Sequence, residues 1–134
     1  MTTNSNYDES AKLLLRFTIG FLMLVHGVSK LSNGISGIEG MFTNAGIPSF
    51  LAYGVYLGEV LAPLMLIIGF RVKIASVLIL GTMAVAIVLA HSNDIFLITK
   101  HGAWAIEVQM LYFLGSLTIL LQGAGKYSVD EYKK

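Results

Sequence analysis

The chain has 134 residues, with nine Lys and Arg against eight Asp and Glu and a formal net charge of +1. Hydrophobic residues make up 55% of the sequence and charged residues only 13%, about half the charged share of a soluble domain, and the mean hydropathy is +0.74. This composition excludes soluble catalytic modules such as a Rossmann domain or a P-loop ATPase, and the charge gives no basic surface for nucleic acid.

Four apolar runs follow one another along the chain, at residues 13–31, 50–70, 74–91 and 103–122. At a rise of ~1.5 Å per residue, each run is long enough to cross a hydrocarbon core of about 30 Å. The sequence therefore predicts an all-α, membrane-embedded four-helix antiparallel bundle, with residues 1–134 as a single domain. The segment before the first run contains Asp8 and Glu9 and is not a basic n-region, so we expect this run to remain as the first helix.

The segment between the first two runs contains apolar residues at helical spacing and ends in Gly46-Ile47-Pro48. This pattern predicts a short amphipathic helix over residues 35–45 at the outer membrane interface. An ordinary loop with scattered apolar residues is the alternative interpretation.

Small residues recur on the expected helices and predict close helix packing, which in lipid depends on close approach of the backbones. They are Gly20, Gly27, Gly54, Gly58, Ala62, Gly81 and Ala84. Pro63 lies four residues after Glu59 and has no N–H, so the carbonyl of Glu59 loses its usual helical donor and a kink is expected there.

The basic residues divide unequally between the two sides of the predicted bundle. One side has Lys12, Arg16, Arg71, Lys73, Lys126, Lys133 and Lys134, and the other has only Lys30 and Lys100. By the positive-inside rule, both termini should be cytoplasmic, in an inner (plasma) membrane protein with several spans.

Charged and polar side chains inside the apolar runs need an explanation, because each charge at bilayer depth costs ~2.5–3.5 kcal/mol. Measured from the cytoplasmic boundary at ~1.5 Å per residue, their depths are ~5 Å for Arg16, ~16 Å for Glu59, ~20 Å for His26, ~22 Å for Glu107 and ~27 Å for both Lys30 and His91. All except Arg16 fall between mid-membrane and the outer surface. On the first helix, moreover, Arg16, His26 and Lys30 share one arc with Gly20 and Gly27.

These positions predict an outer-facing polar pocket lined by His26, Glu59 and Glu107, with Lys30 and Arg16 balancing the charge. The alternatives are a structural Glu59 ion pair between the first two helices, an interhelical hydrogen bond at His26, an interfacial His91, and Arg16 and Lys30 side chains that reach opposite surfaces. No catalytic residue is assigned and no metal site is expected. A haem between His26 and His91 is disfavoured, and Glu-x-x-His pairs for a dinuclear site are lacking. The absence of cysteine excludes thiol and iron–sulfur chemistry by this chain alone.

Several short motifs resemble the DoxX family of small integral membrane proteins. They are Leu14 to Gly20, Val25 to Leu31, Met41-Phe42, Ala45 to Pro48, Gly58-Glu59, Gly69, Arg71, His91 and the tail Gly123 to Asp130. The resemblance implies a four-helix membrane protein associated with respiratory redox complexes, one relative being described as a subunit of a quinone-reducing thiosulfate oxidoreductase. The family supplies no established catalytic residues.

The leading hypothesis is an inner-membrane subunit of a quinone-linked redox complex, with a quinone-like or other small amphipathic ligand in the polar pocket and no intrinsic cofactor. His26 would donate to a ligand carbonyl, and Glu59 would exchange the proton that accompanies reduction. The alternative is an accessory or scaffold subunit that stabilises larger membrane partners. A small transporter is disfavoured because no inverted repeat is visible. The expected partners are the lipid bilayer and either other membrane subunits or further copies of the chain.

Overall fold

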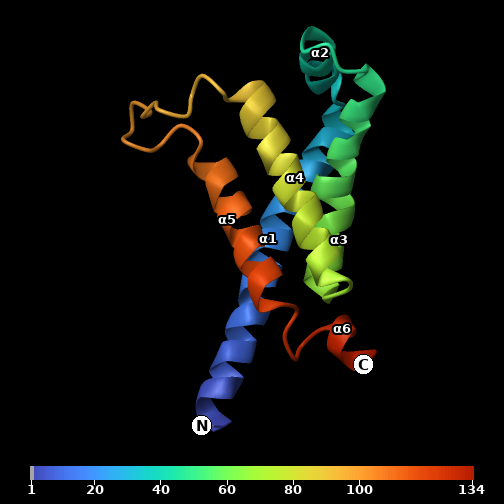
Figure 1. The fold of residues 1–134 in the computed structure, drawn as a ribbon, viewed down its shortest axis with the longest axis vertical. Coiled ribbons are helices and arrows are strands. Elements are labelled where there is room, and N and C mark those ends of the chain that lie inside the picture. The colour runs from blue at the N-terminus through green and yellow to red at the C-terminus, as the bar shows by residue number, and fades with distance from the viewer. Residues whose placement is uncertain (1) are drawn as a thin grey trace.

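The computed structural model describes residues 2–134, which form an all-helical fold with an isolated bridge between Ile98 and Trp104 and no β-strand (Figure 1). The helical elements in chain order are α1 (Thr2–Asn33), α2 (Ser36–Asn44), η1 (Ser49–Gly54), η2 (Leu57–Leu61), α3 (Ala62–Ile68), α4 (Val72–Ala90), α5 (Glu107–Gln122) and α6 (Val129–Tyr132). Both ends of the chain lie at the same end of the molecule, opposite α2 (Figure 1).

Three helical segments are long and apolar enough to cross a membrane: Ser5–Asn33, Ser49–Ile68 and Val72–Ala90. They correspond to the first three predicted spans and confirm that the chain has the character of a membrane protein. A short helix, α2, occupies the segment for which sequence reasoning offered either an interfacial helix or a loop.

The fourth predicted span begins later than expected. Helix α5 starts at Glu107, not at residue 103, and has 16 residues. The residues before it belong to a hairpin-like loop in which Ala103 accepts from the Thr99 N–H at 2.7 Å, and the Trp104 indole donates to the Ile95 carbonyl at 2.6 Å. These cross-loop hydrogen bonds take the place of the first helical turn.

The second span combines three kinds of helix. A 3₁₀ segment (η1) leads into a π-helical turn (η2), and an ordinary α-helix (α3) follows with Pro63 near its start. Proline removes a hydrogen-bond donor and crowds the carbonyl four residues earlier, and a π-turn accommodates this conflict by widening the helix. The interruption expected around Glu59 is therefore present, as a π-turn that contains Glu59 itself.

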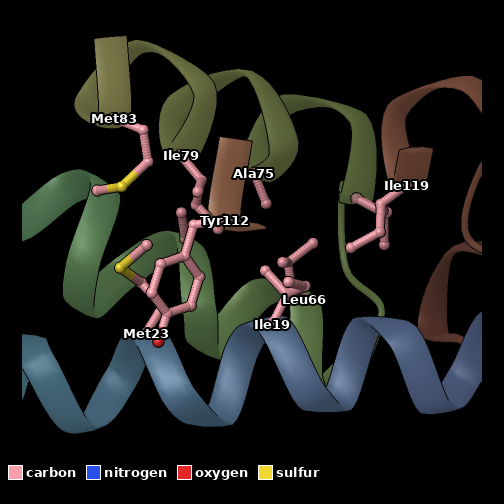
Figure 2. Packing of buried hydrophobic residues seen from close by; sticks show 10 residues of the cluster. Ile19, Met23, Leu66, Ala75, Ile79, Met83, Tyr112 and Ile119 are labelled. Atoms are coloured by element: carbon pink, nitrogen blue, oxygen red, sulfur yellow. The ribbon is translucent and has the colours of Figure 1, made fainter. Parts of the chain in front are cut away.

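Helices α1, α3, α4 and α5 pack around one apolar core. Figure 2 shows Met23 of α1, Met83 of α4 and Tyr112 of α5 close together, and Ile19 of α1 beside Leu66 of α3. In lipid, such an interface is stabilised by van der Waals contact and not by the hydrophobic effect. Its glycines therefore contribute by allowing the helix backbones to approach closely.

Three of the predicted small residues lie at tight helix contacts. A Cβ added at Gly27 would lie 2.0 Å from the Glu59 carbonyl oxygen, one added at Gly20 would lie 2.9 Å from the Pro63 carbonyl oxygen, and one added at Gly58 would meet Thr82 Oγ1 at 1.7 Å. By contrast, added Cβ atoms at Gly54 and Gly81 would meet nothing within 4 Å. The carbonyl that precedes Pro63 by four residues thus lies against the bare backbone of α1.

Candidate functional site

A cavity of about 640 Å³ is lined by residues of α1, α2, η1, η2, α4 and α5. Helix α2, which contributes to its wall, lies at the end of the molecule away from the termini (Figure 1). Most of its wall is apolar, including Met23, Phe42, Leu78 and Leu89. The polar side chains that line it are His26, Lys30, Glu59, Thr82, His91, Gln109 and Tyr112. Six of these seven side chains form three pairs.

The first pair joins α1 to the π-turn. The Lys30 ammonium lies 2.6 Å and 2.7 Å from the two carboxylate oxygens of Glu59. Glu59 is only 4% exposed, whereas the Lys30 side chain is 31% exposed. The Tyr56 hydroxyl also donates to the Lys30 carbonyl at 3.3 Å. Lys30 is therefore the donor that the buried carboxylate requires, and the pair holds a positive and a negative charge at the cavity wall.

The second pair brings α1 and α5 together. His26 Nδ1 lies 3.0 Å from the Leu22 carbonyl oxygen and 3.4 Å from the Tyr112 hydroxyl, and the two rings meet edge to face at 5.6 Å. In Figure 2 the Tyr112 side chain crosses from α5 towards α1. If the Nδ1–H donates to Leu22, Nε2 is left as an acceptor.

The third pair is His91 with Gln109, and Asp94 connects it to the loop after α4. His91 Nδ1 lies 3.1 Å from Asp94 Oδ2, and its Nε2 lies 3.2 Å from Gln109 Nε2. These distances agree with a ring whose Nδ1–H donates to the carboxylate while Nε2 accepts from the Gln109 amide. The Asp94 carboxylate thus orients His91 from the loop side.

The five residues predicted to bind a ligand divide between two places. His26, Lys30 and Glu59 line the cavity, whereas Glu107 and Arg16 do not. Glu107 is exposed in the first turn of α5, about 200° around the helix from Gln109. Its expected meeting with His26 and Glu59 is therefore wrong, because the opposite face of α5 is turned to the cavity.

Arg16 lies at the other end of the core and is completely buried. Its guanidinium donates to the Leu66 carbonyl of α3 at 2.8 Å and to the Tyr127 carbonyl of the C-terminal tail. The same tail is fixed by Asp130, whose N–H donates to the Gly69 carbonyl at 2.9 Å. In this structure Arg16 binds backbone carbonyls and does not balance charge at the cavity.

Thr82, Gln109 and Tyr112 line the cavity but were not among the residues predicted from the sequence to form the pocket. A charged side chain inside an apolar run demands a partner because of its cost in the bilayer, whereas a tyrosine, a threonine or an amide there carries a much weaker signal. The spacing could have helped, because Gln109 and Tyr112 are three residues apart and share one face of a helix.

Comparisons with known proteins identify one matching family and one similar curated protein. The family model described as DoxX matches residues 11–92. The chain is also 29% identical, over 124 residues, to a Bacillus subtilis (strain 168) protein named "Putative oxidoreductase CatD", and the match covers 92% of this chain and 87% of that relative. No solved structure matches the chain.

Proposed function

The chain belongs to the DoxX family, and from that premise we propose that it is a membrane subunit of a redox assembly that holds a quinone-like ring in the cavity between α1, α4 and α5. The observation that carries this proposal is an apolar cavity with three polar pairs on its wall. Its volume of about 640 Å³ is in the range of small-molecule sites, which combine apolar walls with a few polar groups. The name of the Bacillus subtilis relative supports a redox setting.

The residues present suit a planar ligand with two carbonyl groups. A quinone, when bound, accepts two electrons and two protons. The Gln109 amide can donate to one carbonyl, and the His26 ring can donate to another from Nε2 in the tautomer whose Nδ1 accepts from the Tyr112 hydroxyl. The Glu59 carboxylate, which is paired with Lys30, can accept a proton at the cavity wall and pass it to the ligand as the ligand is reduced. Because the sequence contains no cysteine, electrons would come from a partner subunit or another bound cofactor.

We expect Gln109→Leu to weaken binding of a photoreactive azidoquinone by the protein in nanodiscs by about tenfold. One hydrogen bond contributes ~0.5–1.5 kcal/mol, and ~1.4 kcal/mol corresponds to a factor of ten. Competition with the unmodified quinone gives the affinity, and mass spectrometry of the labelled peptides gives the position, which should fall on α4 and α5. His101→Leu is the matched control, since His101 is exposed and does not line the cavity. Equal affinity of both variants and the parent, or labelling spread over the lipid-facing surface, would contradict the proposal.

We further propose that α5 is a fourth crossing, which would place both termini in the cytoplasm in an inner membrane. The shared position of the two ends supports an even number of crossings (Figure 1). Since the sequence has no cysteine, single cysteines can report topology. In cells, an impermeant maleimide should label Lys100→Cys directly and Lys134→Cys only after permeabilisation. The reverse pattern would invert the orientation, and direct labelling of both positions would indicate an odd number of crossings.

A second candidate function is an accessory subunit that stabilises larger membrane partners without binding a ligand. The completed Lys30–Glu59 pair favours this alternative, because the buried carboxylate already has both oxygens bound. Gentle purification from native membranes distinguishes the two functions. An accessory subunit should co-purify in fixed ratio with its partners and carry no quinone in the lipid extract.

A further inference from the structure

A second cavity, of about 850 Å³, lies at the opposite end of the molecule, near the termini. It is bounded by the first turns of α1, the start of α4 and the C-terminal tail, and basic side chains dominate its wall. Its cations are Lys12, Arg71, Lys73, Lys126 and Lys134.

The acidic residues of this cavity are already bound within the protein. Glu9 pairs with Lys12 at 2.8 Å and accepts from the Lys126 backbone N–H. Asp130 accepts from the backbone N–H groups of Arg71 and Val72 at 2.7 Å and 2.9 Å.

The third acid, Glu131, pairs with Lys134 at 3.0 Å. Within residues 2–134, no carboxylate lies at ion-pair distance from the side chains of Arg71, Lys73 or Lys126. All three side chains are exposed. The cavity therefore has an excess of positive charge that the described part of the chain does not neutralise.

Arg71 has an unusual backbone for a residue with a side chain. With φ 44° and ψ 51° it is left-handed, and every other positive φ in the described chain belongs to glycine. Glycine adopts this conformation without strain, so the arginine is held here at a cost in backbone energy. Its guanidinium lies 5.7 Å from the Phe70 ring centroid at the edge of the cavity.

We propose that this cavity binds the phosphate headgroup of an anionic phospholipid, through Arg71, Lys73 and Lys126. The candidate span Val72–Ala90 begins directly beside Arg71, so these cations lie where an apolar helix leaves the hydrocarbon and meets the headgroup layer. Basic pockets between membrane helices are suited to such headgroups. Tyr127, whose ring centroid lies 5.8 Å from the Lys126 ammonium, is of a residue type enriched at this interface. This inference does not depend on the proposed quinone site.

The test measures lipid adducts on the full chain by native mass spectrometry, after exchange into detergent with equal amounts of phosphatidylglycerol and phosphatidylcholine. We expect the parent protein to retain phosphatidylglycerol preferentially, and Arg71→Gly together with Lys73→Gln to lower that retention at least fivefold. Lys100→Gln, an exposed loop lysine outside the cavity, is the matched control and should change nothing. Arg71→Gly alone relieves the strained backbone, so its melting temperature in detergent should be no lower than that of the parent while its lipid retention falls.

Equal retention by the double variant and the parent would overturn the proposal, as would equal retention of the two lipids by the parent protein. Inorganic phosphate added during the exchange separates the two sources of the same chemistry. If millimolar phosphate displaces the lipid completely and itself remains bound, the cavity is a site for soluble phosphate and the lipid assignment is wrong. Persistence of the lipid under those conditions supports a headgroup site.

Discussion

Replacing Gly27 by alanine is expected to separate α1 from the π-turn and to destabilise the protein by about 3 kcal/mol, the upper end of the usual cost of overpacking. The added methyl group would lie 2.0 Å from the Glu59 carbonyl oxygen and 2.6 Å from its carbonyl carbon. Both atoms are backbone, so no flexible side chain can move aside and the helices themselves must shift. The measurement is thermal unfolding of purified protein in detergent, followed by circular dichroism.

Gly81→Ala is the matched control for this substitution. Gly81 is also a helical glycine within a candidate span, but a Cβ there would meet nothing within 4 Å. Alanine is the better helix former by about 1 kcal/mol, so this variant should be as stable as the parent or more stable. If Gly27→Ala and Gly81→Ala unfold at the same temperature, the close contact between Gly27 and Glu59 is not present in the protein in detergent.

Removing the lysine of the Lys30–Glu59 pair is expected to cost more than removing the charge of the glutamate. Lys30→Met leaves a carboxylate that is 4% exposed without its donor, and breaking a buried pair in this way costs about 3 kcal/mol. Glu59→Gln leaves an ammonium whose side chain is 31% exposed, and its flexible stem can carry the charge outward. The loss in this second variant should be nearer 1 kcal/mol.

A double-mutant cycle measures the pair directly. Lys30→Met combined with Glu59→Gln removes both charges, so the double variant should unfold at a higher temperature than Lys30→Met alone. Lys100→Met, at an exposed loop position, controls for loss of a lysine as such. Simple addition of the two single effects would mean that the pair makes no net contribution. Lower stability of Glu59→Gln than of Lys30→Met would mean that the glutamate has a further partner.

Several features of this protein could be predicted from its sequence because they depend only on residues near one another in the chain. The length and apolarity of the runs determine that Ser5–Asn33, Ser49–Ile68 and Val72–Ala90 can span a membrane. Pro63 determines that the second span is interrupted within the preceding turn. The short motifs of the sequence also sufficed to identify the DoxX family, whose model matches residues 11–92.

The position of each polar side chain along its helix was also predictable, because the rise per residue is constant. On that basis His26, Lys30 and Glu59 were expected in the same half of the molecule, and all three line the cavity. What depth does not give is the direction in which a side chain points around the helix axis. Glu107 was expected in the pocket, but it lies on the face of α5 that is turned away from the cavity.

Only the tertiary structure decided which groups meet. In it, Lys30 pairs with Glu59, and Gln109 and Tyr112 line the cavity. Arg16 instead donates to the carbonyls of Leu66 and Tyr127. The rotation and spacing of the helices depend on contacts between residues far apart in sequence, such as Gly27 against the Glu59 carbonyl. The hydrogen bonds of the loop before α5 likewise decided where that helix begins. Hydropathy and periodicity indicate which residues favour lipid or a helix, but they do not depend on which residue lies on the facing helix.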